Sequence, residues 1–189
     1  MQDITLFTDE DLVRLFKKGN EKAFEVLYSR YAPKLKRVIY YYINDYEEVE
    51  DVFHDVTLRV IRHIESFNIK MAFSSWVYQI AINCSKNYIK RNKKSETLIE
   101  REKFRLLDSE EKSPSPEETF INESDMKEFN RAVDHLDDKF RDVFILRFDQ
   151  GVRYSKISEI LHCSERTAKW RMKKAVEKIA HYLKEKDVI

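Results

Sequence analysis

The sequence has little glycine and proline, with only 2 Gly and 3 Pro among 189 residues. An all-β sandwich or barrel needs turn residues about every 8–12 positions, so this composition excludes that fold class. A glycine-rich phosphate-binding loop is also excluded, because neither Gly19 nor Gly151 has a second glycine nearby. The composition therefore predicts a mostly helical chain.

Long apolar runs are also lacking. The longest run, from Val38 to Ile43, is much shorter than the roughly 20 residues that a membrane-spanning helix needs. The N-terminus does not combine a charged start with an apolar stretch, as a signal peptide would. We therefore expect a cytoplasmic protein that does not insert into a membrane.

Cysteine is scarce, and the two that occur, Cys84 and Cys163, are far apart and form no CxxC motif. A structural zinc site needs about four ligands, and no nucleophile, acid–base dyad or set of metal ligands stands out in the sequence. The expectation is two buried, reduced thiols, no metal, no cofactor and no enzymatic activity.

Charge, in contrast, is abundant and segregated along the chain. The 35 basic and 34 acidic residues nearly cancel, yet residues 44–56 carry six acids and no Lys or Arg, whereas residues 86–94 carry five bases and no acid. Residues 95–128 are again acidic, and residues 164–186 hold eight bases against three acids. Each block alone could be a solvated helix face. Two basic blocks separated by an acidic stretch fit two contacts with one polyanion better.

Apolar residues recur at helical spacing through residues 1–92. The clearest stripes are Leu35, Val38, Ile39, Tyr42 and Ile43; Val49, Val52, Phe53, Val56, Val60 and Ile64; and Phe73, Trp76, Val77, Ile80, Ala81, Cys84 and Tyr88. Such faces are buried only against one another, so they predict a helical bundle with Trp76 in its core. Pro33 is expected to kink its helix or to start a new one.

The pattern breaks down over residues 93–126, which are acidic, contain Pro114 and Pro116 and predict a flexible linker. Apolar spacing resumes over residues 127–189, a length of about 60 residues that folds alone only marginally. The predicted fold is all-α, with two small helical domains at residues 1–92 and 127–189 joined by that linker.

The segment YSKISEILHCSERTAKWRMK, residues 154–173, has the spacing of a helix-turn-helix. His162 in the turn must adopt a left-handed backbone conformation. The expected inward stripe of the second helix is Ala168, Met172, Ala175, Val176, Ile179 and Leu183.

The opposite face of this second helix carries Arg166, Lys169, Trp170 and Lys173 in one stripe. Arg can pair with guanine edges and Lys can neutralise phosphates. An ordinary basic surface helix is the alternative, but solvent faces seldom need an exposed Trp. The stripe therefore favours duplex DNA binding.

A second polar face is predicted near the end of the first domain. Asn83, Asn87 and Arg91 recur at i, i+4 and i+8, while residues 67–72 lack helical rhythm and predict a loop above this face. Such a pairing of loop and helix could hold an unstacked base. Spacing alone leaves duplex DNA, single-stranded DNA and RNA open.

Larger stretches resemble a known family. AFEVLYSRYAPKLKRV (23–38), EEVEDVFHDVTLRVIRHIESFN (47–68) and FSSWVYQIAINCSKNYIKR (73–91) resemble region 2 of bacterial sigma factors of the extracytoplasmic-function (ECF) group. LDDKFRDVFILRFDQGVRYSKISEILHCSERTAKWRMKKA (136–175) resembles their region 4. The resemblance covers most of the chain in the expected order, without a region 3 domain.

This resemblance implies a transcription initiation factor that binds core RNA polymerase at the clamp coiled coil and the flap. Region 2 would read and melt the −10 element, capturing a flipped base of the non-template strand, and region 4 would read the −35 element as duplex. A possible further partner is an anti-sigma factor, and the free chain is expected to be a monomer.

The resemblance also carries implied site residues. Those for the −35 element are Arg166, Thr167, Lys169, Trp170, Arg171 and Lys173. Those for the −10 element are Asn68, Lys70, Asn83, Lys86, Asn87, Lys90 and Arg91. Those for core polymerase are Glu50, Asp51, His54 and Asp55. Three positions depart from the family pattern: His54 replaces the usual Gln, Thr57 a common Phe, and Trp170 a common small residue.

Two other functions remain open. A conventional helix-turn-helix regulator would bind duplex DNA unaided as a dimer. A helical adaptor would sequester protein partners without touching DNA.

Overall fold

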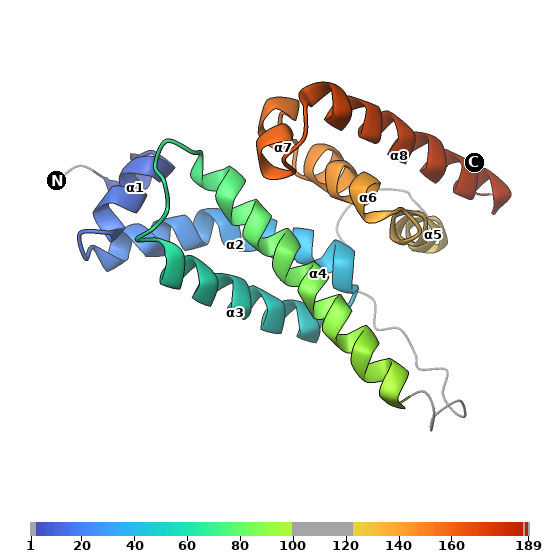
Figure 1. The fold of residues 1–189 in the computed structure, drawn as a ribbon, viewed down its shortest axis with the longest axis horizontal. Coiled ribbons are helices and arrows are strands. Elements are labelled where there is room, and N and C mark those ends of the chain that lie inside the picture. The colour runs from blue at the N-terminus through green and yellow to red at the C-terminus, as the bar shows by residue number, and fades with distance from the viewer. Residues whose placement is uncertain (1–2, 100–122, 187, 189) are drawn as a thin grey trace.

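The computed structural model describes residues 3–99, 123–186 and 188, with side chains described outside residues 93–99 and 123–127. Within these ranges the chain forms helices and no strand. Figure 1 shows two groups of helices, with α4 running along the boundary between them. The predicted all-α class is confirmed.

The first group contains the 3-10 helix η1 (Ile4–Leu6), α1 (Asp9–Phe16), α2 (Glu21–Ile43), α3 (Tyr46–His63) and α4 (Phe73–Ile99). The second group contains α5 (Glu123–Asp134), α6 (Asp138–Phe144), the π-helical turn η2 (Ile145–Asp149), α7 (Tyr154–Ile160) and α8 (Glu165–Glu185). Helices α2, α3 and α4 pack on one another, whereas α8 packs against α5, α6 and α7.

Short polar side chains cap the starts of α1 and α3. Thr8 accepts a hydrogen bond from the Asp11 amide at the start of α1, and Asp45 accepts bonds from the amides of Glu47 and Glu48 at the start of α3. These bonds satisfy amides that have no partner within the helix. His162 has φ 47°, which confirms the left-handed turn residue.

The helix boundaries add detail to two expectations. Helix α2 runs without interruption through Pro33, so this proline does not start a new helix. Packing of α2 against α1, α3 and α4 outweighs the one backbone hydrogen bond that proline removes. Helix α4 continues to Ile99, beyond residue 92, and α5 begins at Glu123. The central part of the predicted linker, residues 100–122, lies outside the described residues.

Most residues of the predicted stripes are buried in the cores, but several are only partly buried or exposed. All six residues of the Val49–Ile64 stripe are buried. Trp76 is only half-buried, with its ring 4.8 Å from that of Phe67, and Val176 is 48% exposed at the edge of its stripe. Cys84 is buried, which raises the pKa of its thiol, whereas Cys163 is half-buried rather than buried.

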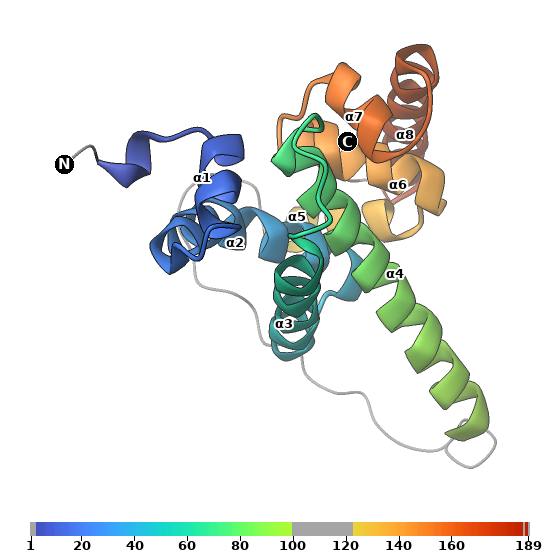
Figure 2. The same cartoon turned by 60° about the vertical axis from the view of Figure 1, so that its left-hand side comes forward.

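The two groups of helices share one apolar cluster. Val143, Ile145, Leu146 and Ile157 of the second group belong to the same buried cluster as the core of α1–α4, while a smaller cluster lies between α5, α6 and α8. Helix α7 packs against α4, and η2 packs against α2; Figures 1 and 2 show α7 beside the N-terminal half of α4. This docking was not anticipated from the sequence.

Candidate nucleic-acid interface

Helix α8 presents an exposed basic stripe. Ser164 caps the helix by accepting a hydrogen bond from the Thr167 amide at 3.0 Å, and Ala168 is fully buried against the rest of the domain. Because Ala168 fixes the rotation of α8, the residues that flank it in the helical period point outward. The exposed members of the stripe are Arg166, Lys169, Trp170 and Lys173.

The two lysines of this stripe form weak ion pairs along the helix, and the Lys169 ammonium also lies 5.8 Å from the centre of the Tyr154 ring on α7. Lys169 lies 3.7 Å from Glu165, and Lys173 lies 4.0 Å from Glu177. Exposed pairs of this kind contribute about 0–1 kcal/mol each. The two lysines can therefore exchange their carboxylate partners for phosphates at little cost.

Two other residues predicted for this face lie to its side. Thr167 is half-buried, with its hydroxyl 2.8 Å from that of Ser164, and Arg171 is half-buried as well. Trp170 is 51% exposed, with its ring 5.9 Å from that of Phe140. The structure thus brings Arg166, Lys169, Trp170 and Lys173 together and leaves Thr167 and Arg171 off the stripe.

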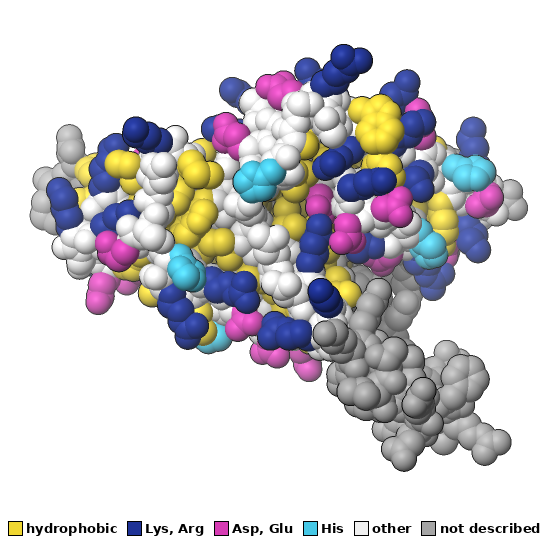
Figure 3. Space-filling model, in the orientation of Figure 1, with side chains coloured by type: hydrophobic (Ala, Val, Ile, Leu, Met, Phe, Trp, Pro, Cys, Tyr) yellow, Lys and Arg dark blue, Asp and Glu magenta, His cyan; other side chains and the backbone are white. Residues whose placement is uncertain are grey.

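Helix α4 carries the second polar face. Asn83, Asn87, Lys90 and Arg91 are all exposed, as the spacing predicts. Figure 3 shows Lys and Arg side chains gathered over α4 and α8 on the face seen in Figure 1. The two predicted faces are therefore accessible on the same side of the molecule.

A residue not anticipated from the sequence joins this second face. Arg59, on α3, lines a surface hollow of about 280 Å³ together with Asn87, Lys90 and Arg91. Arg91 also approaches Asp55 at 3.7 Å, while the hollow itself is lined by three cationic side chains and one amide. A phosphate fits this chemistry. Arg59 directly precedes Val60, which belongs to the buried stripe of α3. Its position next to this stripe is the sequence feature that could have predicted its place beside α4.

Lys86 differs from the other predicted residues of α4. Its ammonium lies 2.6 Å from Asp142 and 3.7 Å from Asp138, both on α6 of the other helix group. Asp142 is only 7% exposed and also accepts a hydrogen bond at 2.5 Å from the Tyr42 hydroxyl. Burial raises the pKa of the Asp142 carboxyl, although Lys86 and Tyr42 act in the opposite direction. Lys86 must leave this pair before it can reach a nucleic acid.

Further polar contacts join α4 to the C-terminal helices. Ser75 donates a hydrogen bond to Glu159 at 3.2 Å, and Tyr78 donates one to Gln150 at 3.2 Å. Burial raises the pKa of Tyr78 to about 12. One side of α4 is thus occupied by the second domain, while the side with Asn83 and Asn87 stays open.

The predicted loop between α3 and α4 has a buried base and an exposed tip. Phe67 is buried, and its ring lies 6.0 Å from that of Phe73. The tip, residues 68–71, is exposed, and the Asn68 side chain accepts a hydrogen bond from the Lys70 amide at 3.0 Å. Asn68 and Lys70 are therefore both accessible on the surface.

The acidic face of α3 is accessible too. Glu50, Asp51 and His54 are exposed, and Asp55 is half-exposed. Glu50 pairs with Lys36 at 2.6 Å on the surface. These four residues share one side of α3, so they can meet a partner together.

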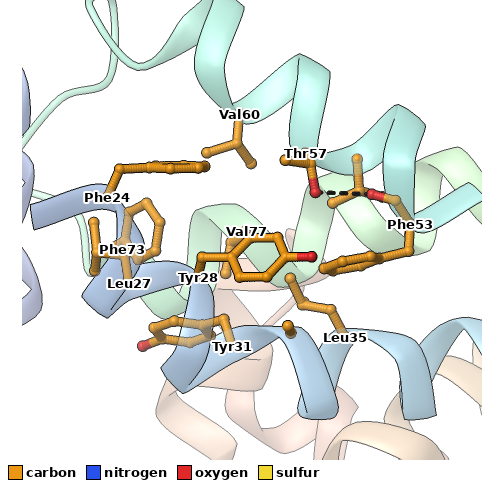
Figure 4. Close-up of a pocket in the computed structure, with 12 residues that line it drawn as sticks. Phe24, Leu27, Tyr28, Tyr31, Leu35, Phe53, Thr57, Val60, Phe73 and Val77 are labelled. Carbon is orange, nitrogen blue, oxygen red and sulfur yellow. Dashed lines mark hydrogen bonds between the residues drawn. The ribbon is translucent and has the colours of Figure 1, made fainter. Parts of the chain in front are cut away.

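Thr57 lies beside an apolar cavity of about 30 Å³ between α2, α3 and the N-terminal part of α4 (Figure 4). Its hydroxyl donates a hydrogen bond to the Phe53 carbonyl at 3.0 Å, and the rings of Phe24, Tyr28 and Phe53 help to line the space. The cavity is about the size of one water molecule. Thr57, where the family resemblance implies a common Phe, is one of its lining residues.

Within the described ranges, no group of three or more His, Cys, Asp or Glu side chains is arranged to hold a metal ion. None of the helices found there is long and apolar enough to cross a membrane.

Comparison with protein families assigns two parts of the chain. The family model of sigma-70 region 2 matches residues 27–95, and that of sigma-70 region 4 matches residues 126–179. The first match contains the loop and the polar face of α4, and the second contains the basic stripe of α8.

Curated relatives match along nearly the whole chain. The ECF RNA polymerase sigma-E factor of Escherichia coli (strain K12) is 30% identical over 177 residues, covering 91% of this chain and 92% of the relative. The RNA polymerase sigma-H factor of Pseudomonas aeruginosa is 27% identical over 181 residues, covering 93% and 94%.

Solved structures share the fold at lower identity. The sigma factor RpoE in complex with the anti-sigma factor NepR, from Bartonella quintana, superposes with a TM-score of 0.68 at 20% identity, covering 86% of this chain and 98% of that one. CnrH in complex with the cytosolic domain of CnrY superposes with a TM-score of 0.70 at 18% identity, covering 94% and 97%.

Proposed function

The chain belongs to the ECF group of sigma factors, which act in promoter-specific transcription initiation, and we propose that its two exposed polar faces divide promoter recognition between them. The face of α8 reads the −35 element as duplex, and the face of α4 with its preceding loop reads the −10 element. The observation that carries this division is that each matched region presents its own accessible face, built on a separate helix.

In the proposed −35 contact, α8 enters the major groove with its N-terminal half. Arg166 is exposed near the helix start, where it can bond a guanine edge, and Lys169 and Lys173 can neutralise phosphates. Thr167 and Arg171 remain candidate backbone contacts beside the stripe. Trp170 extends the apolar contact area next to Phe140.

In the proposed −10 contact, α4 and the loop receive the melted non-template strand. Asn83 and Asn87 offer amides to base edges, and the loop tip with Asn68 and Lys70 covers a flipped base. The hollow of Arg59, Lys90 and Arg91 holds a strand phosphate. Lys86 joins this face only when it leaves Asp142.

The remaining expectations concern proteins. We propose that Glu50, Asp51, His54 and Asp55 dock on the clamp coiled coil of core polymerase, while the C-terminal domain binds the flap. The factor itself is not an enzyme, because the polymerase performs RNA synthesis, and it works in the cytoplasm, where the polymerase is. An anti-sigma factor is a candidate partner, and the free chain is a monomer of two domains, residues 1–92 and 127–189.

Binding energy explains why such a factor needs the polymerase. A single recognition helix contacts few base pairs, but two weak contacts on one rigid polymerase gain effective concentration. Base stacking in the melted strand adds on the order of 1–3 kcal/mol per base. We therefore expect the free chain to bind promoter DNA poorly and the holoenzyme to bind it well.

The direct test is transcription in vitro from a pool of fragments of the source genome, with bacterial core polymerase alone and with this protein added. The expected result is a set of start sites that require the protein and share two sequence boxes at fixed spacing. Core binding without any new start sites would favour the adaptor instead. Salt-sensitive binding to a palindromic duplex without core binding would favour the conventional regulator.

A further inference from the structure

Helix α1 contacts both ends of the loop that joins α3 to α4. The Lys17 ammonium, directly after α1, donates hydrogen bonds to the backbone carbonyls of Glu65 at 2.9 Å and Phe67 at 3.0 Å. The Glu10 carboxylate, in the first turn of α1, accepts a hydrogen bond from the Phe73 amide at 3.3 Å. Both residues come from a part of the chain that precedes the region 2 match.

These contacts lie where the loop backbone needs partners. Phe73 is the first residue of α4, so its amide has no acceptor within the helix. A carboxylate at this end of a helix is also favoured by the helix dipole. At the other end of the loop, Lys17 binds two carbonyls in the turns that follow α3.

Helix α1 is itself firmly held, so it can act as a support. Leu12 and Val13 are fully buried. Asp9 forms an ion pair with Arg30 of α2 at 2.6 Å and also accepts a hydrogen bond from the Tyr31 hydroxyl. The side chains at positions 10 and 17 therefore reach the loop from an element fixed on α2.

We propose that Lys17 and Glu10 are positioning residues that hold the loop tip, residues 68–71, in the conformation that receives the melted −10 strand. This inference rests on the proposed function of the loop. The exposed tip holds two local hydrogen bonds to Asn68, from the amides of Lys70 and Met71, whereas both ends of the loop are fixed by α1. Ordering a loop during binding costs conformational entropy, and holding it in advance removes that cost. Neither residue touches the nucleic acid.

The test compares Lys17→Met with the rescue variant Lys17→Arg and the control Lys18→Met, a change at the adjacent exposed lysine. Two quantities are measured in the full chain: amide hydrogen exchange over residues 67–72, and transcription with core polymerase. Transcription is compared between a promoter mapped with the wild-type protein and the same promoter with its −10 box altered at one base.

For Lys17→Met we expect faster exchange in the loop and a fall of about tenfold in the preference for the unaltered −10 box, or about 1.4 kcal/mol. Lys17→Arg, which keeps donors at that position, should restore most of the preference, and Lys18→Met should behave as wild type. Glu10→Leu should act like Lys17→Met, whereas Glu10→Gln keeps an acceptor for the Phe73 amide and should lose less.

Unchanged exchange and unchanged −10 preference in Lys17→Met would overturn the proposal, as would an equal loss in Lys18→Met. A loss of activity that is the same on both promoters, with no change in their ratio, would also overturn it, because it would indicate general destabilisation. The proposed function is judged separately, since its failure would show as an absence of start sites with the wild-type protein.

Discussion

Helices α4 and α8 carry the two faces assigned to DNA, yet their surroundings differ. On α8, the two lysines of the exposed stripe form ion pairs along the same helix, Lys169 with Glu165 and Lys173 with Glu177. On α4, Lys86 pairs with the buried Asp142 of the other domain, and Ser75 and Tyr78 also bond to that domain. One recognition face is free, and the other is partly covered.

This difference shows that two lysines on DNA-binding faces can differ in how much free energy it costs to release them from their ion pairs. Releasing Lys169 from an exposed i,i+4 pair costs little. Releasing Lys86 leaves a carboxylate that is 7% exposed without its cation. Lys86 must therefore leave Asp142 before the whole −10 face is accessible, whereas the −35 face is already exposed in the docked arrangement.

The largest effect on transcription is expected for a substitution on the exposed face of α8. Arg166→Ala removes a side chain placed to bond a base edge, and such contacts are worth about 1–3 kcal/mol. Initiation at promoters that depend on their −35 box should fall about 5- to 150-fold, measured as transcription in vitro. Lys184→Ala, at the exposed end of the same helix, is the control. Equal losses in both variants would contradict the proposal that the α8 stripe contacts the −35 element.

The stability of the protein at alkaline pH tests whether the C-terminal domain covers one side of α4. Burial raises the pKa of Tyr78 to about 12, against about 10 for an exposed tyrosine. Its contribution to stability is complete below pH 10 and is lost between pH 10 and 12, because only the unfolded chain ionises there. The free energy of unfolding should fall by about 1.4 kcal/mol per pH unit for this one group. Urea unfolding of Tyr78→Phe should show a shallower fall, and an identical slope would contradict this account.

Two double-mutant cycles measure how strongly the ion pair on each face contributes to stability. For Lys86→Ala and Asp142→Ala we expect a coupling of about 1–2 kcal/mol in the free energy of unfolding, because the pair is largely buried. For Lys169→Ala and Glu165→Ala we expect about 0.3–0.5 kcal/mol. Urea unfolding of each single and double variant gives both values. Equal couplings would mean that the two faces are equally free.

The smallest effect should arise away from both faces. Thr57→Leu places extra methyl groups in the cavity of about 30 Å³, and at about 24 cal/mol per Å³ filling it stabilises the chain by about 0.7 kcal/mol. Thr57→Ala enlarges the cavity and should destabilise. Thermal unfolding measures both changes, and the coupling between Lys86 and Asp142 should be the same in the Thr57→Leu background. A changed coupling would show that the core of α2 and α3 influences the docking.

Local sequence signals determined much of this protein. The apolar period of the Val49–Ile64 stripe predicted its burial, and the outward phase of Arg166 and Lys169 followed from the burial of Ala168 in the same helix. Such predictions succeed because a helix repeats every 3.6 residues, so one buried residue fixes the direction of its neighbours. The family resemblance was likewise carried by residues close together in the sequence.

Tertiary structure decided the features that join distant segments. The pairing of Lys86 with Asp142, the place of Arg59 beside Asn87, and the reach of Lys17 to the Phe67 carbonyl all link residues on separate elements. The unbroken course of α2 through Pro33 was also decided there, by packing on three other helices. Local periodicity specifies which way a side chain points, but only the packing of whole helices specifies what it meets.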